Sequence, residues 1–248
     1  IEPKFLQPEM HTLRDHRRPV ARAKDMQRVL LTVSGGLSSI KGTHAYRYIK
    51  YGQETTYTSN KSKVVPVPER STCAARDPWY DLRLGPNRGF AFWPMAHHYR
   101  HVIPANPDDV VCNHRMFDLL KAKLTKAQCN VLVAVLNSTW IGLAKTFYGR
   151  YTGTEGSLDT EVIDVELIDV PDPRTATADV ASRLVRAFKS LCKRDIGRLV
   201  EEALIDCHSY ERALELASRR TTLPEELTQP DRRELDDAVF ELLGVEDA

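Results

Sequence analysis

Residues 125–148 read Thr125-Lys-Ala-Gln-Cys-Asn-Val-Leu-Val-Ala-Val-Leu-Asn-Ser-Thr-Trp-Ile-Gly-Leu-Ala-Lys-Thr-Phe-Tyr148, the clearest structural signal in the chain. Thr125, followed three residues later by Gln128, forms a capping box, which is typical of the start of a helix. Apolar residues then recur at helical spacing, at Val131, Leu132, Val135, Leu136 and Leu143. We therefore expect a helix over residues 124–148 with one face in a hydrophobic core.

The sequence beyond Thr175 has a helical pattern throughout. Val180, Leu184 and Phe188 share one helical face, and a final helix is expected from Asp231 to Gly244. A further apolar stripe between these two helices also has helical spacing, with Ile196, Leu199, Val200, Ala203, Leu204 and Cys207. These patterns predict an all-helical C-terminal region over residues 174–248.

Upstream of residue 124 the pattern favours short strands. Arg28–Val33, residues 90–93 and Val110–Asn113 are expected strands, and Tyr46–Tyr51 is expected to pair with Thr55–Thr58. Residues 162–170 alternate between apolar and polar side chains, which predicts another strand. The sequence therefore predicts an α+β fold, in which a mixed β-sheet domain with packed helices (residues 1–173) precedes the all-helical region (174–248).

The net charge of the 248-residue chain is only +1, but this total conceals two opposed regions. Residues 1–150 carry 23 basic and 11 acidic side chains, whereas residues 151–248 carry 12 basic and 23 acidic ones. Such asymmetry is typical of a region that faces a polyanion joined to something else. The near-neutral total is therefore weak evidence against nucleic-acid binding.

Other classes are excluded by composition. The longest apolar stretch, around residues 131–136, is far too short to cross a membrane, and residues 1–10 do not form a signal peptide. Five cysteines without Cys-x-x-Cys spacing fit a reduced, cytoplasmic protein. Because the chain begins with isoleucine, we expect it to be a piece of a longer protein.

Residues 71–101 combine aromatic and arginine side chains. Trp79, Tyr80 and Trp93 are interleaved with arginines that are able to bind phosphates or guanine edges. The alternative is a β-rich core in which the aromatic rings are buried and the arginines are solvated. Composition alone favours that core.

A second cluster contains His97, His98, His101, Cys112 and His114. Such side chains are able to bind a metal ion. The order His101, Asn106, His114 also faintly resembles that of a His-Asn-His nuclease. The spacing is compressed, however, and the segment is predicted to be strand, so local hydrogen bonds or phosphate contacts are the simpler interpretation.

The loop from Gly149 to Gly156 lacks the spacing of a phosphate-binding loop. Arg150 and Tyr151 in this loop are placed either to reach into a DNA groove or simply to connect two elements. The acidic residues that follow, Asp159, Glu161, Asp164 and Glu166, have no lysine nearby in the same segment. They are therefore interpreted as a solvated face rather than a nuclease site.

Several blocks in a fixed order resemble the target-recognition region of N6-adenine DNA methyltransferases from restriction-modification systems. The most specific part runs from Leu136-Asn-Ser-Thr-Trp140 to Asp169-Val-Pro-Asp-Pro173. This part includes Gly149-Arg150, Gly153-x-Glu-Gly156 and Leu158-x-Thr-Glu-Val162, and the weaker blocks outside it are Arg76-Asp-Pro-Trp-Tyr-Asp-Leu82 and the tail 233–244. Together they cover about residues 70–248.

This resemblance implies that the chain recognises double-stranded DNA beside a methyltransferase domain. The family's Asn-Pro-Pro-Tyr/Phe motif and its Gly-rich loop for S-adenosylmethionine do not occur here. We therefore expect no catalytic residue, metal or cofactor in this chain. S-adenosylmethionine and methyl transfer are expected in an upstream methyltransferase domain or a partner subunit, and no membrane partner is expected.

The predicted DNA contacts are basic or polar side chains of the segment from residue 71 to 151, with Trp79, Tyr80 and Trp93 framing that surface. They are Arg76, Arg83, Arg88, His97, His98, Arg100, Arg115, Lys145, Arg150 and Tyr151. Two alternatives stay open: a metal-dependent nuclease that uses His97, His101 and His114, and a non-catalytic specificity or interaction subunit.

Overall fold

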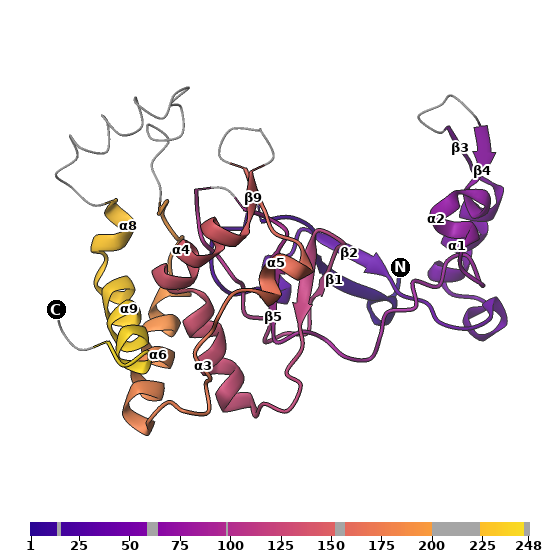
Figure 1. Ribbon diagram of the computed structural model, residues 1–248. Helices are drawn as coiled ribbons and strands as arrows, with labels where there is room; N and C mark the ends of the chain where they lie inside the picture. The colour runs from indigo at the N-terminus through magenta and orange to yellow at the C-terminus, as the bar shows by residue number, and fades with distance from the viewer. Residues whose placement is uncertain (14–15, 59–63, 98, 152–156, 200–223, 246–248) are drawn as a thin grey trace. The chain divides into compact units, whose positions relative to one another are not determined.

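The computed structural model describes residues 1–13, 16–58, 64–97, 99–151, 157–199 and 224–245. Within these residues the chain forms an α+β fold, as predicted, whose elements are shown in Figure 1. The chain divides into two units: unit 1 comprises residues 1–9 and 23–88, and unit 2 comprises residues 10–22 and 89–248. The predicted division at residue 173 follows neither boundary and stays a prediction.

Unit 1 consists of two strand pairs and a helix around a small core. Strands β1 (Leu6–Met10) and β2 (Arg28–Leu31) are antiparallel, and so are β3 (Thr56–Thr58) and β4 (Val64–Pro66). Helix α1 (His44–Glu54) and the short α2 (Ser71–Ala74) complete the unit. Its core is formed by Val33, Ile40, Ala45, Ile49 and Tyr80.

The strand predicted over residues 46–51 is wrong, because these residues belong to α1. Thr43 caps the helix by accepting a hydrogen bond from the Tyr46 N–H, and the Glu2 carboxylate accepts the N–H groups of His44 and Ala45. The capping by Glu2 spans more than forty residues of sequence. The pattern of residues 46–51 alone therefore does not reveal this contact.

The strands of unit 2 form two small sheets. Strand β5 (Ala91–Pro94) pairs with β8 (Met116–Leu119), with Trp93 opposite Phe117. In the second sheet β10 (Leu158–Asp159) lies between β6 (Ala96–His97) and β9 (Arg150–Tyr151), and the short β7 (Val111–Cys112) precedes β8. These strands carry the side chains of the site described below.

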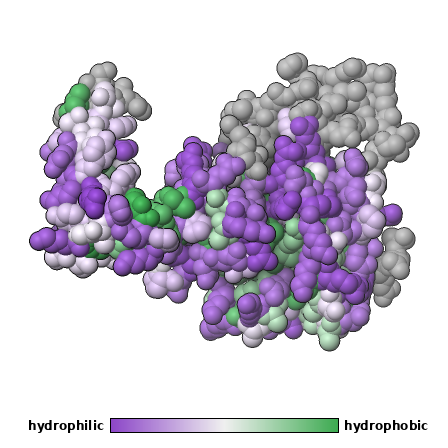
Figure 2. All heavy atoms as spheres, turned by 180° about the vertical axis from the view of Figure 1, so that it is seen from behind, coloured by the Kyte–Doolittle hydropathy of each residue, from purple (hydrophilic) through white to green (hydrophobic). Residues whose placement is uncertain are grey.

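The helices of unit 2 pack around one hydrophobic core. Helix α6 (Ala178–Leu191) lies against both α3 (Lys126–Leu136) and α9 (Pro230–Leu242), while α4 (Thr139–Tyr148) follows α3 (Figure 1). The short α8 (Glu225–Thr228) precedes α9. Side chains from α3, α4, α6 and α9 share this core with Trp93 of β5. The surface of the described residues is correspondingly mostly hydrophilic on the face in Figure 2.

The helix predicted over residues 124–148 is two helices. The predicted capping box of Thr125 and Gln128 is confirmed at the start of α3, but the axis bends by 68° between α3 and α4. No single helix among the described residues is long and apolar enough to span a membrane, although α3 and α4 taken together pass that test of length and composition.

The bend is stabilised by Asn137, whose side chain is buried. Its Oδ1 accepts the Ile103 N–H at 2.9 Å, and its Nδ2 donates to the carbonyls of Ile103 and Val133, each at 2.8 Å. The side chain thus connects the C-terminal end of α3 to residue 103 through two hydrogen bonds, as a neighbouring strand would. Ser138 then caps α4 by accepting the Ile141 N–H.

Helix α9 is bonded to the residues at this bend. The guanidinium of Arg232 donates to the Asn137 carbonyl, and the Asp236 carboxylate accepts the backbone N–H and the hydroxyl of Thr139, at 2.8 and 2.6 Å. The Leu136-Asn-Ser-Thr-Trp140 block therefore has a structural role: it joins residue 103, two helices and the C-terminal helix.

Residues 162–170, predicted as a strand, contain the short helix α5 (Val162–Glu166) instead. Glu161 and Asp164 cap it reciprocally, each accepting the other's backbone N–H. The alternation of apolar residues in this stretch does not produce a buried strand face, since Val162, Ile163 and Leu167 are all exposed. The predicted final helix is confirmed by α9, which ends just before Gly244 at φ +73°.

Replacing Asn137 by alanine should destabilise the protein by about 2–4 kcal/mol, because the buried N–H of residue 103 and two carbonyls lose their partner. Chemical denaturation of the variant and of wild type measures this change. Asn130→Ala on the exposed side of α3 is the matched control and should change stability by less than about 0.5 kcal/mol. Equal effects of the two substitutions would contradict the role assigned to Asn137.

Candidate nucleic-acid interface

A groove of about 680 Å³ lies within unit 2, between segments that are far apart in sequence. Residues 11–13 and 16 form one part of it, β6 and residues after it form a second, and the turn between β7 and β8 forms a third. The lining residues are His11, Thr12, Leu13, His16, Pro94, Ala96, His97, Tyr99, Arg100, Val102, Asn113, His114, Arg115 and Met116. Among the described residues that line the groove are four histidines and two arginines, and none of these described residues is acidic.

Asn113 holds two of these segments together. Its Nδ2 donates to the His11 carbonyl at 2.6 Å, and its Oδ1 accepts the Arg115 N–H at 2.8 Å. The backbone of Arg115 is therefore fixed while its side chain is exposed at the mouth of the groove. A guanidinium on a fixed backbone is well suited to bind a phosphate or a base edge.

Further positive charge gathers around Arg100. Burial lowers the pKa of this guanidinium, the nearby charges of Arg17 and Arg198 lower it further, and the Asp195 carboxylate opposes them. The Nε of Arg100 donates to the Ile196 carbonyl at 3.0 Å, and the guanidinium of Arg198 lies 5.3 Å from the ring centroid of Tyr99. Mutual repulsion of these arginines would be relieved by a bound polyanion.

Below the groove lies a buried polar chain. The Lys145 Nζ is 3.0 Å from His97 Nδ1, and His97 Nε2 is 3.4 Å from the Thr160 hydroxyl, which also accepts the Trp93 Nε1–H at 2.8 Å. Lys145 is only 4% exposed, and burial lowers its pKa to about 7. Both ring nitrogens of His97 thus have partners inside the protein, which fixes the orientation of its ring at the groove.

His101 is buried and has a structural role. Its Nε2 lies 2.7 Å from the Leu136 carbonyl and must carry the proton to donate there. Complete burial and the nearby Lys145 charge hold its pKa well below the usual range, so the ring is neutral. Helix α4 approaches this ring closely at Gly142, where a Cβ would lie 3.3 Å from the ring.

The structure brings three of the predicted DNA contacts, His97, Arg100 and Arg115, into the groove. His97 is only 4% exposed, so the two arginines are the more accessible members. Lys145 is buried beneath the groove and presents no charge at the surface. His98 lies outside the described residues, and so does the side chain of Tyr151.

Three other predicted contacts lie in unit 1 and make local bonds. Arg76 donates to Cys73 Sγ at 3.5 Å, Arg83 donates to the carbonyl of residue 77 at 2.8 Å, and Arg88 donates to Gln7 at 3.3 Å. In unit 2, Arg150 is paired with two carboxylates, Glu161 at 3.3 Å and Asp164 at 3.0 Å. The charge of Arg150 is therefore already compensated.

The aromatic residues predicted to frame the surface are mainly core residues. Trp93 is 1% exposed and Tyr80 is 8% exposed, while Trp79 is half-buried and packs edge-to-face against Tyr80. The structure therefore agrees with the interpretation of these rings that composition alone favoured.

The alternative nuclease site does not come together in the described part of the chain. His97 and His101 are stacked, with ring centroids 6.5 Å apart, but His101 is fully buried and His114 is exposed on a separate turn. No group of three or more His, Cys, Asp or Glu side chains among the described residues is placed to hold a metal ion.

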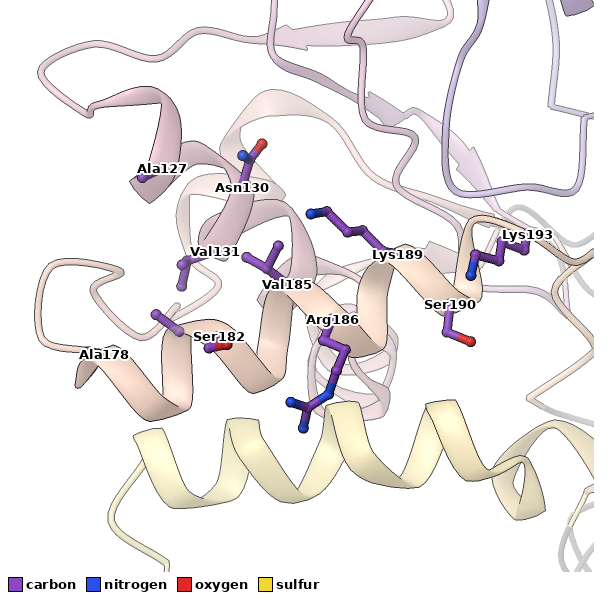
Figure 3. Close-up of a pocket in the computed structure, with 11 residues that line it drawn as sticks. Ala127, Asn130, Val131, Ala178, Ser182, Val185, Arg186, Lys189, Ser190 and Lys193 are labelled. Carbon is purple, nitrogen blue, oxygen red and sulfur yellow. The ribbon is translucent and has the colours of Figure 1, made fainter.

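A second groove, of about 700 Å³, lies between α3 and α6 and carries Arg186, Lys189 and Lys193 (Figure 3). Figure 3 shows Arg186 directed toward α9, where its guanidinium lies 3.4 Å from Glu234. Lys189 lies in the last turn of α6, where positive charge stabilises a helix. The ion pair of Arg186 and the helix-end position of Lys189 therefore account for these two cations without a ligand.

Sequence reasoning missed His11, His16 and Arg17. A signal was present: residues 11–22 hold His11, Arg14, His16, Arg17, Arg18 and Arg22 against a single acidic residue. The described residues of this segment, 11–13 and 16–22, belong to no helix or strand, so a search that follows such elements passes over them.

Comparisons with known proteins give a likeness of fold. The solved structure of the type IIG restriction endonuclease BpuSI superposes with a TM-score of 0.58 at 13% sequence identity, over 97% of this chain. This chain spans only 27% of the length of that protein. No protein-family model matches the sequence, and no curated protein matches it either.

The pH dependence of stability tests the burial of Lys145. Its pKa is about 7 in the folded protein and about 10.5 for an unperturbed lysine, so between these values the unfolded chain binds more protons and stability rises with pH. Lys145→Met should remove this rise, so that wild type gains about 1–2 kcal/mol relative to the variant between pH 7 and pH 9.

Urea denaturation at pH 7, 8 and 9 measures this difference. Lys126→Met, at the exposed start of α3, is the control, and its stability relative to wild type should stay constant over the same range. A constant difference for Lys145→Met would mean that the Lys145 ammonium is solvated rather than buried.

Proposed function

We propose that this chain binds double-stranded DNA and reads its sequence, as the specificity part of an adenine-specific DNA methyltransferase of a restriction-modification system. The observation that carries this proposal is the groove of unit 2, whose described lining residues include four histidines and two arginines and no carboxylate. Such a lining favours a polyanion, because the arginines attract phosphate.

The groove also has the chemistry needed to read bases. Arginine forks bind the O6 and N7 atoms of guanine, and asparagine and histidine side chains offer donors and acceptors to base edges. Arg115 is the residue that we assign to direct contact, since it is exposed and makes no side-chain ion pair in the described part of the chain. Arg100, which is partly buried, supplies positive potential and phosphate contact.

The likeness in fold to part of a type IIG restriction endonuclease supports the restriction-modification context. The adenine-specific methyltransferase is proposed from the sequence blocks that resemble the target-recognition region of such enzymes. Methyl transfer, and the S-adenosylmethionine that it requires, are assigned to a separate methyltransferase domain or partner subunit. This chain then contributes affinity and sequence choice, and no catalytic group of its own.

The wild-type chain should bind a duplex in fluorescence anisotropy. The logarithm of its association constant should fall linearly as the logarithm of the salt concentration rises. Arg115→Ala should weaken binding about 5- to 10-fold at low salt and reduce the slope by about one, because one charged contact is lost. Stability should be unchanged, since the side chain is exposed.

Arg174→Ala is the matched control, because it removes the same charge from a guanidinium that Asp172 already binds. It should change the affinity by less than about twofold. An absence of salt-dependent duplex binding by wild type would overturn the proposal and favour a module that binds only protein. Cleavage of the duplex by this chain alone in magnesium would favour the nuclease instead.

A further inference from the structure

The outer face of helix α1 in unit 1 is formed by His44, Arg47, Tyr48 and Tyr51. These positions are related as i, i+3, i+4 and i+7, so their side chains lie together on one side of the helix. Tyr48 is 56% exposed and Tyr51 is 65% exposed. Two such rings one turn apart, beside an arginine, form a patch rather than scattered exposure.

The opposite face fixes the helix in unit 1. Ala45 and Ile49 are buried in the core with Val33 and Ile40, and Gly52 lets the Trp79 ring approach so closely that a Cβ would lie 2.8 Å from it. The N-terminus is closed by Thr43 and by the Glu2 carboxylate, whose pKa is lowered to about 2 by these hydrogen bonds. The outer face is therefore presented on a rigid, well-anchored helix.

The outer face carries one arginine and lies between two carboxylates, that of Glu2 at the N-terminus of α1 and that of Glu54 in its last turn. Arg47 forms no ion pair within the described residues, and the exposed Lys41 lies just before the helix. Glu54, in the last turn, is the one carboxylate on α1. Unit 1 as a whole holds 12 lysines and arginines against 7 acidic residues. Charge complementarity thus favours an anionic partner.

We infer that the outer face of α1 is a second DNA-contact surface, on which Arg47, Tyr48 and Tyr51 bind the duplex. The four positions span about 10 Å along the helix, and the major groove of B-DNA is about 12 Å wide and admits a helix. Arg47 binds phosphate or guanine, while the tyrosine hydroxyls donate to phosphate oxygens and their rings pack on the sugars.

This inference rests on the proposed function and extends it from unit 2 to unit 1. Each unit then contributes its own contacts to one duplex. Binding through two linked units raises the affinity above that of either unit, so loss of either surface weakens binding. When substitutions in the two surfaces are combined, their fold-changes in affinity should multiply, since the two surfaces make independent contacts.

Anisotropy with the full chain and a duplex at low salt tests the inference through Arg47→Ala and the double variant Tyr48→Ser, Tyr51→Ser. Each should weaken binding at least fivefold, and Arg47→Ala should reduce the salt slope by about one. Glu54→Gln should leave the affinity unchanged or raise it, because it removes the one carboxylate of the helix. Circular dichroism and urea midpoints should match wild type, since all four side chains are exposed.

Arg233→Ala and Phe240→Ser, at exposed positions of α9, are the matched controls and should stay within twofold of wild type. If wild type binds and Arg115→Ala weakens binding, but the α1 variants stay within twofold, the inference fails and the proposed function stands. If Glu54→Gln weakens binding as much as Arg47→Ala, the face does not contact a polyanion and the inference fails. If wild type does not bind any duplex, both fail.

Discussion

The buried side chain of Asn137 is the constraint on which unit 2 depends. This side chain bonds to both the N–H and the carbonyl of residue 103, while the backbone carbonyl of Asn137 accepts a hydrogen bond from the buried guanidinium of Arg232. One amide thereby ends α3, sets the 68° change of direction into α4 and joins both helices to α9. A buried amide that is fully bonded specifies a single arrangement, because any other leaves polar groups unpaired in the core.

The position of α4 in turn determines the floor of the groove. The helix carries Lys145 to His97, whose ring is then held between the lysine and the Thr160 hydroxyl. This places a rigid, buried polar chain beneath Arg100 and Arg115, which lie above it on irregular segments. In the proposed function, the buried lysine and histidine therefore have a structural role and the more accessible arginines have the binding role. Contacts held on a rigid support lose little conformational entropy when DNA binds.

The sequence was sufficient for much of the fold and for part of the site. The capping box at Thr125 and the end of α9 are local signals, and the structure confirms both. The bend at Asn137 and the helix at residues 44–54 depend on partners tens of residues away, so patterns of period 2 or 3.6 did not reveal them. Lys145 carries the same ambiguity, since only the packing of α4 on β6 shows that it is buried. The arginine-rich character of the surface was predictable, but its grouping into a groove was not.

If duplex DNA lies in the groove of unit 2, as proposed, it should protect the backbone of the segments that line this groove. Hydrogen–deuterium exchange of the chain with and without a saturating duplex measures this protection along the whole backbone. We expect slower exchange in peptides that contain the lining residues 11–13, 97, 99, 100 and 113–116. Protection confined to the helices α6 and α9, with unchanged exchange in the peptides of the groove, would show that the duplex binds elsewhere.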